Sequence, residues 1–555
     1  MKGVCQYLMN ILNLDGIWDF SFDPESRCLP DCLPHLEWES ALSVPGCFDV
    51  SAPFFGKRGV GYYHCTVRTT GLIRLSVDGL GVAGKIFWDG KLIGECPYAY
   101  MPEKFTFDAG KTEEHHLVIA VCNHFNKVFF PYFDFYAYGG IFGSVQIEEL
   151  PGYAIDLLKV TTLDCSKGRI RAAVTADRFF RKPRKITFEI DGKEVLTGEF
   201  AGKENVYEFN VPDFKLWSPE VPHLHRLRVV LGEYEESCSI GLRIIEARGT
   251  QLFLNGKELR LMGYNRHDSH PQFGAAVPPS LMAADLQMVK NQGCNFLRGS
   301  HYPQRKTFLD LCDKLGILFW EETLGWDVRD EELFKPEFLF KQKDQARKLV
   351  RNHYNHPSII IWGFMNETLS EDKRCRKIIQ KVYDTYKAGD TTRFVTYASN
   401  RYEKDICMDI VDIVAMNPYP GWGNMNFDEV YSLHRIRPRL EEICKAVPAD
   451  KPYMISEIGA SAVYGHRDPY RVRWSEEYQA ELVTEVCRVV LGDPRYCGLA
   501  FWHFCDAKSY LNGGRVKGIN DKGILNEYRQ PKLAWQAITD AISEMGISGQ
   551  KGRQK

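Results

Sequence analysis

The sequence predicts a multidomain protein in which a jelly-roll β-sandwich and an immunoglobulin-like β-sandwich precede a (β/α)8 TIM barrel. At 555 residues, the chain is too long to fold around a single hydrophobic core, so several domains are expected. In residues 1–243 short apolar runs alternate with a period of two and are separated by turn residues. In the remainder, strand-like runs alternate with stretches of helical periodicity. The first pattern is typical of antiparallel sandwiches and the second of parallel barrels.

The segment 1–150 is predicted to form the jelly roll, a sugar-binding-like β domain. Its alternating runs include YYHCTVRTT, IRLSVDGLGVAGKIFWDGKLIGE and HHLVIAVCNHF, with Gly and Asp-Gly turns among them. The segment 151–243 repeats this texture in AIDLLKVTTLDC, RIRAAVTAD, KITFEIDG and HRLRVVLGEYEESCSIGL. About 90 residues in roughly seven short strands suit an immunoglobulin-like sandwich.

The segment 244–546 is predicted to form the barrel, followed by a polar tail at 547–555. Strand-like runs occur at 258–264, 295–299, 317–322, 358–364, 394–398, 411–416, 452–457 and 497–503. Helical stretches occur at 280–292, 304–315, 337–352, 370–389, 427–446, 474–492 and 531–544. The fifth connection, NRYEKDICMD, is too short for a full helix. Eight strands with crossover helices over about 300 residues indicate a (β/α)8 barrel.

Composition narrows the classes of partner. Lys plus Arg number 70 and Asp plus Glu 72, so the near-neutral chain offers no electrostatic argument for nucleic acid or an anionic membrane. No run approaches the ~18 apolar residues of a membrane span. The opening MKGVCQYLMNILNL lacks a small-residue cleavage site, and the 17 cysteines are scattered without zinc-like pairs. These features predict a reduced, cytoplasmic protein.

Two carboxylates close apolar runs of the predicted barrel. IIIWGFMNE ends on Asn366 and Glu367 at the fourth strand, and PYMISEIG places Glu457 at the end of the seventh. The carboxyl ends of barrel strands line one face, so both side chains are expected in one mouth. Glycoside hydrolysis requires such a pair, one acid and one nucleophile or base. The structural alternative is that each glutamate is ion-paired at its strand end.

Polar and aromatic groups follow the other strands. They are Asn265, Arg266, His267 and Asp268 in GYNRHD, Arg298 and His301 in RGSHYP, Tyr419 and Trp422 in MNPYPGW, and Trp502 in WHFCD. Considered alone, His301 could instead be a buried histidine with a purely structural hydrogen bond. Trp502, considered alone, could instead be a residue of the hydrophobic core. Together these groups predict a sugar-sized cavity with a hydrogen-bonding rim and aromatic walls.

The loop RVKGINDKG, residues 515–523, carries Arg515, Lys517, Asn520 and Lys522 after the eighth strand. Its glycines allow the backbone to approach a ligand closely. Cations and an amide at the mouth of an otherwise neutral protein indicate a carboxylated substrate. The alternative is a solvated basic loop.

GYNRHDSHP, LRGSHYP, FMNE and ISEIGA, in this order on a barrel behind two β domains, resemble glycoside hydrolase family 2. That family contains β-galactosidases, β-glucuronidases and β-mannosidases. The resemblance implies a retaining double displacement with Glu367 as general acid/base and Glu457 as nucleophile, and Asn366 holding the sugar 2-hydroxyl. FDFYAYGGIFGSV resembles the loop by which the family's first domain reaches the barrel mouth, so Asp134 would contact the distal ring hydroxyls. The alternative for Asp134 is a turn former.

Within the family, β-glucuronidases carry an Asn-x-Lys motif that reads the C6 carboxylate of the sugar. Asn520 and Lys522 match it, and Arg515 is near the position of an accompanying arginine. The resemblance therefore implies a β-uronidase, with β-glucuronidase first and β-galacturonidase as the alternative. His301, Tyr419 and Trp502 complete the expected substrate-binding set.

Two departures leave the sugar's O4 configuration open. Gly423 stands where enterobacterial-type glucuronidases have a tyrosine that touches the carboxylate, and the loop GWDVRDEELFKPE is short. Arg329 in that loop is a candidate substitute for the missing contact, with a surface role as its alternative. A β-galactosidase and a non-catalytic carbohydrate-binding protein are the rival readings. No cofactor and no required metal are predicted, and the sequence leaves a homo-oligomer open.

Overall fold

The computed structural model describes residues 11–124, 135–329, 331–422, 433–509 and 515–544. The chain divides into two compact units. The first comprises residues 1–124, 138–244 and 351–357, and the second comprises residues 125–137, 245–350 and 358–555. Among the described residues, the longest apolar helices fall short of what a membrane crossing needs.

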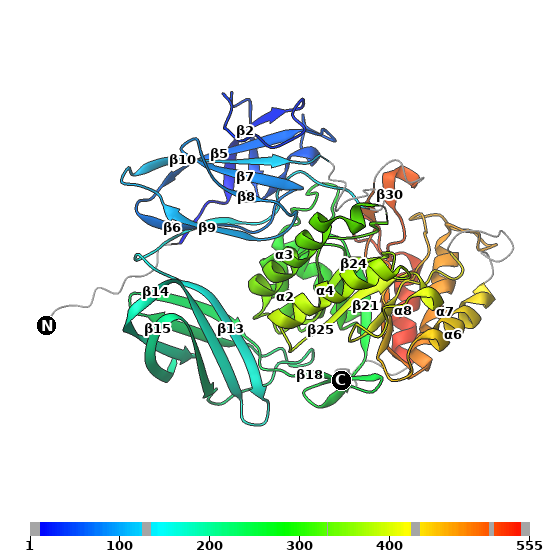
Figure 1. Cartoon of the computed structure of the whole chain (residues 1–555). Coiled ribbons are helices and arrows are strands. Elements are labelled where there is room, and N and C mark those ends of the chain that lie inside the picture. The colour runs from blue at the N-terminus through cyan, green and yellow to red at the C-terminus, as the bar shows by residue number, and fades with distance from the viewer. Residues whose placement is uncertain (1–10, 125–134, 330, 423–432, 510–514, 545–555) are drawn as a thin grey trace, which may run out of the picture. The chain divides into compact units, whose positions relative to one another are not determined.

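The first unit begins with a sandwich of two antiparallel sheets (Figure 1). One sheet has the order β3-β2-β5-β10-β7-β8, with bounds Ser40–Val44, Gly16–Asp23, Val60–Arg68, Glu114–Cys122, Ala83–Trp88 and Lys91–Cys96. The other has the order β1-β12-β6-β9, with bounds Ile11–Asn13, Val145–Glu149, Leu72–Val77 and Glu103–Asp108. Phe20 and Ile119 of the first sheet share a buried core with Ile73 and Ile147 of the second. Two sheets facing one apolar core form a β-sandwich. The strands β4 (Gly46–Cys47) and β11 (Gly140–Ile141) form a short additional pair.

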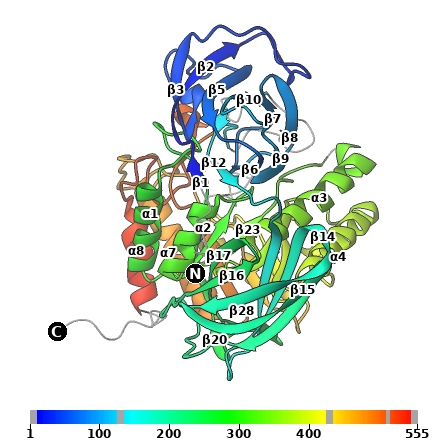
Figure 2. The same ribbon diagram turned by 90° about the vertical axis from the view of Figure 1, so that its left-hand side faces the viewer.

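A separate five-stranded antiparallel sheet follows in the first unit. Its strands are β13 (Ile155–Asp164), β14 (Arg169–Ile190), β15 (Lys193–Asn210), β16 (His225–Leu231) and β17 (Tyr234–Ile240). The prediction of about seven short strands was wrong, because β14 and β15 form one long hairpin, seen side by side in Figure 2. The register of this hairpin shifts between Thr175 and Arg184, so the chain bends without leaving the sheet. Pro183 lies in that irregular stretch, where the missing N–H removes no regular ladder bond.

A three-stranded sheet of β18 (Ile245–Arg248), β19 (Gln251–Leu254) and β20 (Lys257–Leu259) precedes the barrel. The first barrel strand was predicted at 258–264, but it runs over β21, Leu261–Arg266. The difference arises because Leu259 pairs with Leu252 in the hairpin β19–β20. The start of the predicted barrel strand, up to Leu259, therefore belongs to the β19–β20 hairpin instead.

Eight parallel strands close into a barrel in chain order, which confirms the predicted fold class. They are β21, β22 (Phe296–Gly299), β23 (Leu318–Glu322), β24 (Ile359–Asn366), β25 (Phe394–Ser399), β26 (Val414–Met416), β27 (Tyr453–Ile455) and β28 (Tyr496–Phe501). Every residue of these strands is buried. Strands covered on both faces read as near-continuous apolar runs, which is why they were recognisable in the sequence.

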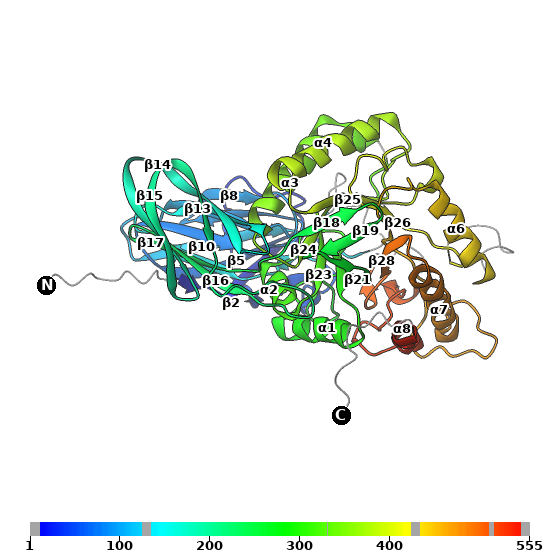
Figure 3. The same ribbon diagram turned by 90° about the horizontal axis from the view of Figure 1, so that it is seen from below.

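Helices surround these strands (Figure 3). They are α1 (Pro279–Asn291), α2 (Lys306–Leu315), α3 (Pro336–His353), α4 (Lys373–Gly389), α6 (Ile436–Ala446), α7 (Glu476–Gly492) and α8 (Leu533–Glu544). The fifth connection carries only the short 3-10 helix η3, Tyr402–Lys404, as its length predicted. The predicted start of the next helix, at residue 427, lies outside the described residues.

Short elements complete the connections. They are the 3-10 helices η1 (Phe48–Val50), η2 (Glu331–Phe334), η4 (Leu433–Arg435) and η6 (Val516–Gly518), and the strands β29 (Ala507–Lys508) and β30 (Ile519–Asn520). β29 and β30 form an antiparallel pair after the eighth barrel strand. This pair positions the loop that the sequence analysis singled out.

Candidate active site

The end of strand β24 is distorted where its polar residues begin. Its pairing with β25 shifts between Gly363 and Asn366, and Glu367 has a φ of 54°. A glutamate in this left-handed region costs on the order of 1–3 kcal/mol and persists only where its surroundings fix it. Here the Glu367 N–H donates to the Ala398 carbonyl at 2.9 Å. The distortion ends the regular alternation of the strand and sets the directions of Asn366 and Glu367.

Glu457 lies two residues beyond β27, with its side chain only 5% exposed. Arg298 Nη1 donates to its Oε1 at 2.7 Å, and the Tyr419 hydroxyl donates to its Oε2 at 2.9 Å. His301 Nε2 is 3.9 Å from Oε1. Each carboxylate oxygen therefore has a defined partner, which fixes the plane of the carboxylate.

The proton affinity of Glu457 reflects opposing influences. Burial raises its pKa to about 8, and the charge of Glu367 acts in the same direction, whereas Arg298 and Tyr419 oppose the rise. That Glu367 contributes shows that the two carboxyls interact electrostatically across the barrel mouth.

Glu367 has a different environment from Glu457. Its side chain is 16% exposed, and Asn417 Nδ2 donates to its Oε1 at 3.1 Å. Asn417 is oriented by the Ser456 hydroxyl, which donates to its Oδ1 at 2.7 Å. On the exposed side Arg329 Nη2 lies 3.4 Å from Oε2. Glu367 is thus the more accessible of the two carboxyls.

Arg298 is a fully buried cation at the centre of the site. Its Nε donates to Glu322 at 2.9 Å, its Nη1 to Asn265 at 3.1 Å and its Nη2 to Asn366 Oδ1 at 2.8 Å. Buried ions persist only with such pairing. The contacts with Glu322 and Glu457 give the cation a carboxylate on either side. It therefore couples the positions of groups from several strands.

The amide of Asn366 has a single possible orientation. Its Oδ1 accepts from Arg298 and also from Asn417 at 3.1 Å, so its Nδ2 is the atom left over. Among the described residues, this buried Nδ2 has no acceptor. A buried donor without an acceptor is costly, which indicates that a ligand oxygen completes it.

Aromatic rings form a wall beside these polar groups. The ring of His301 stacks between Trp502, at 5.2 Å, and Trp326, at 5.9 Å. His301 Nδ1 also lies 2.9 Å from Glu322. Phe135 lies 5.8 Å from Trp326 and 5.3 Å from His267, ring to ring. His301 and Trp502 are therefore both buried in one aromatic cluster at the barrel mouth.

The segment around Asn520 and Lys522 is buried. The exposed fractions are 0% for Asn520 and 8% for Lys522, so the alternative of a solvated basic loop is wrong for these two residues. Lys522 Nζ lies 6.0 Å from the ring centre of Tyr419, the residue that contacts Glu457. Asn520 Oδ1 is 3.4 Å from the Lys522 N–H, while its Nδ2 has no acceptor among the described residues.

A buried ion pair holds this segment in place. Lys532 Nζ donates to Asp506 at 2.8 Å, to the Ala462 carbonyl at 2.7 Å and to the Asp521 carbonyl at 2.9 Å. Burial raises the pKa of Asp506 to about 7, against the opposing charge of Lys532. One ammonium thus joins the loops after β27 and β28 to the chain that enters α8. We call this arrangement the Lys532 junction.

The other two cations of this loop are less buried than Lys522. Arg515 is partly exposed, and its carbonyl accepts a hydrogen bond from the Gly518 N–H at 3.2 Å. Lys517, two residues further along the chain, is exposed. Asp134 and Gly423 lie outside the described residues.

Several residues of the site were not predicted from the sequence. Glu322 closes the run ILFWEE, Asn417 follows Met416 in MNPYP, and Trp326 follows the third strand, yet none was assigned a role. Arg298 was noted only as part of the rim. Their common signal was a polar or aromatic residue at or just beyond a strand's carboxyl end, the same signal that identified the glutamates.

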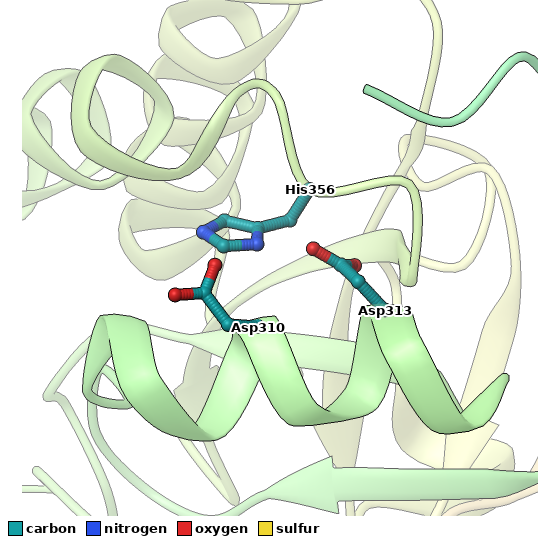
Figure 4. Close-up of side chains that lie close together, drawn as sticks. All are labelled: Asp310, Asp313 and His356. Atoms are coloured by element: carbon teal, nitrogen blue, oxygen red, sulfur yellow. The ribbon is translucent and has the colours of Figure 1, made fainter. Parts of the chain in front are cut away.

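A group of acidic residues lies away from the barrel mouth, on helix α2. Figure 4 draws Asp310 and Asp313 together with His356, which precedes β24. Lys306 Nζ donates to Asp310 at 2.7 Å, and Asp313 accepts the Ser358 N–H at 3.0 Å. Both carboxylates therefore accept hydrogen bonds from protein donors.

Comparisons with known proteins identify the family of the barrel domain. Residues 245–547 match the family model described as glycosyl hydrolases family 2, TIM barrel domain. The β-glucuronidase of Rattus norvegicus is 32% identical over 422 residues, covering 72% of this chain and 63% of that protein. The β-glucuronidase of Streptococcus agalactiae is 26% identical and covers 94% of both chains.

Among solved structures, the family 2 β-galacturonidase from Eisenbergiella tayi bound to galacturonate is similar over 97% of both chains. The TM-score is 0.88 and the sequence identity 30%. The chain spans less than two thirds of the length of the rat protein that it matches. With a family match over more than half of its residues, the chain belongs to the glycosyl hydrolases of family 2.

Proposed function

We propose that the protein is a retaining exo-β-glycosidase that releases a terminal β-linked uronic acid, with β-glucuronides as its first substrate class. The observation that carries this proposal is the buried pair Asn520 and Lys522. A buried ammonium and an amide nitrogen without an acceptor are suited to a carboxylate. A neutral sugar has only a hydroxyl at C6 and needs no such cation.

In the first step Glu457 attacks the anomeric carbon. A C–O bond to its carboxylate forms as the bond from C1 to the leaving oxygen breaks, and Glu367 gives its proton to that oxygen. This requires a proton on Glu367 and the negative charge on Glu457, against the effect of burial, which raises the pKa of Glu457. Arg298 and Tyr419 favour that distribution, because both donate to Glu457.

In the second step water hydrolyses the glycosyl-enzyme. Glu367, now ionised, takes a proton from the water as the oxygen bonds to C1 and the bond to Glu457 breaks. Asn417 donates to Glu367 and holds it in place in both steps. Two inversions leave the sugar with its original β configuration.

The remaining groups hold the sugar. The unsatisfied Nδ2 of Asn366 is suited to the 2-hydroxyl, where a hydrogen bond strengthens as charge develops in the transition state. His301 and Trp502 supply an apolar wall, and Tyr419 lies between Glu457 and Lys522. We assign Asp134 to the distal hydroxyls and Arg515 to the carboxylate on the resemblance to the family alone.

β-Galacturonidase is the second candidate, with the same chemistry. It is favoured by the similarity of this chain, over 97% of both chains, to a β-galacturonidase bound to galacturonate. Gly423 points the same way, since it lacks the tyrosine of enterobacterial-type glucuronidases. Arg329 contacts Glu367 and is the cation available to compensate for that loss.

We further propose the domain limits 1–150, 151–243 and 244–546 and a cytoplasmic location. Every cysteine of the described residues is a free thiol, as a reducing compartment favours.

The direct test of function is a set of chromogenic β-glucuronide, β-galacturonide, β-galactoside and β-glucoside substrates. Turnover of a uronide and little of the neutral sugars is expected, whereas the reverse order would establish a neutral glycosidase.

A further inference from the structure

The chain between β27 and α7 exposes aromatic side chains beside the candidate active site. The Trp474 side chain is 41% exposed and meets Trp422 edge-on, with ring centres 5.4 Å apart. The Arg473 guanidinium lies 4.0 Å from the ring centre of Trp422 and 5.3 Å from that of Trp474. We call Trp422, Arg473 and Trp474 the aromatic ledge.

The backbone under the ledge is held in an unusual conformation. Trp474 has a φ of 68°, a region that a bulky residue rarely adopts. Its carbonyl accepts the Val463 N–H at 2.9 Å, and Trp474 forms a β-bridge with Ala462. Arg473 Nη2 donates to the Trp422 carbonyl at 2.6 Å. Strain of this kind persists where the surroundings enforce it, and it concentrates at ligand sites.

The ledge is continuous with two parts of the candidate site. The Trp422 N–H donates to the carbonyl of Tyr419 at 3.1 Å, and Tyr419 contacts Glu457. At the other end the Ala462 N–H donates to the Asp521 carbonyl at 3.0 Å, between Asn520 and Lys522 in sequence. The ledge therefore borders the pocket assigned to the terminal uronic acid.

We propose that the aromatic ledge binds the leaving group and that this leaving group is a sugar, so that the substrate is a uronosyl oligosaccharide. This inference rests on the proposed function. An exposed indole with a fixed orientation offers its face to the C–H groups of a pyranose ring and is covered when they stack. Arg473, stacked on both indoles, holds the two rings at a defined spacing.

The experiment compares kcat/KM for three β-uronides that differ only in their leaving group: a hexose, 4-nitrophenol and methanol. Trp474→Ala and Trp474→Leu should lower the value for the hexose disaccharide about tenfold and change the methyl uronide less than twofold. Trp474→Phe should retain most activity, because it keeps an aromatic face. Tyr470→Ala is the matched control, since Tyr470 is 88% exposed in the same loop and should have no effect.

A second readout needs no turnover. Tryptophan fluorescence of the Glu457→Gln protein should respond to the uronosyl-hexose disaccharide, and Trp474→Leu in that background should weaken binding about tenfold. An equal loss on all three uronides would make Trp474 a scaffold residue, and a loss confined to the nitrophenyl uronide would assign the ledge to flat aromatic leaving groups. Either outcome overturns the inference. Failure of the proposed function is distinct, because the parent protein would then turn over no uronide and bind no disaccharide.

Discussion

Arg298 Nη1 lies 2.7 Å from Oε1 of Glu457, and the side chains are 0% and 5% exposed. The same guanidinium donates to Asn366. One cation therefore contacts both the proposed nucleophile and the amide proposed for the 2-hydroxyl. Because these two partners come from different strands of the barrel, Arg298 fixes the position of the Glu457 carboxylate relative to the Asn366 amide.

Replacing the proposed nucleophile should stop turnover without removing substrate binding. Glu457→Gln is expected to lower kcat on a uronide about 10⁴-fold or more, since no covalent intermediate can form. Binding of a uronide measured by calorimetry should persist.

In the parent, the carboxyls of Glu367 and Glu457 should be roughly 5–5.5 Å apart, and NMR should show release of the β anomer first. A separation near ~9 Å or initial α product would contradict a retaining mechanism.

Removing the proposed general acid/base should affect substrates according to their leaving group. Glu367→Ala should slow an alkyl uronide about 10³-fold, and a uronide of an acidic phenol much less in its first step, because that phenolate needs no proton. Added azide should speed turnover of the phenyl substrate and yield the β-uronosyl azide, which NMR identifies. If azide has no effect, or if both substrates slow equally, Glu367 has another role.

Lys522 separates a uronidase from a neutral glycosidase. Charged hydrogen bonds contribute about 1.5–3 kcal/mol, so Lys522→Ala should lower kcat/KM on a uronide on the order of 10²-fold. Residual activity on a galactoside or glucoside should change little. Lys517→Ala is the control, since Lys517 is an exposed cation of the same loop. Equal damage to charged and neutral substrates would show that Lys522 is a scaffold residue and remove the main support for a uronidase.

The raised pKa of Glu457 also predicts how stability depends on pH. The folded protein holds this proton up to a pKa of about 8, whereas the ordinary value is 4.5. Stability from the protonated carboxyl is therefore fully present below pH 4.5 and is lost as the pH rises through about 8. Glu457→Gln does not ionise, so its Tm should match the parent near pH 4.5 and exceed it by about 1–3 °C at pH 8. Calorimetric scans at pH 4.5 and pH 8 test this prediction. If the Tm difference between variant and parent became smaller as the pH rose, a raised pKa of Glu457 would be contradicted.

Much of the fold was predictable because buried parallel strands leave apolar runs in the sequence. IIIWGFMNE is the clearest case, since β24 ends at Asn366 as the run does. The long β14–β15 hairpin was not predictable, because Pro183 and its charged neighbours read as a break, while the pairing that continues β14 comes from distant residues.

The residues of the candidate site also fall into a predictable and an unpredictable group. Glu367 and Glu457 stood out because each ends an apolar run. The roles of three further residues depend on partners 24 to 159 residues away in the sequence, such as Glu457 for Arg298; these residues are Arg298, Glu322 and Asn417. Local periodicity carries no information about such partners. The burial of Lys522 likewise depends on how several loops fold together.

The Lys532 junction limits how the specificity of this protein can be re-engineered. Its ammonium joins Ala462, Asp506 and Asp521, so the loop with Asn520 and Lys522 is not an interchangeable module. A loop of residues 515–523 grafted into a relative without the lysine and its aspartate would lack the support that orients the two polar side chains. Transplanting the preference of this protein therefore requires the anchor as well as the loop, and variant libraries confined to the rim would sample mostly unsupported geometries.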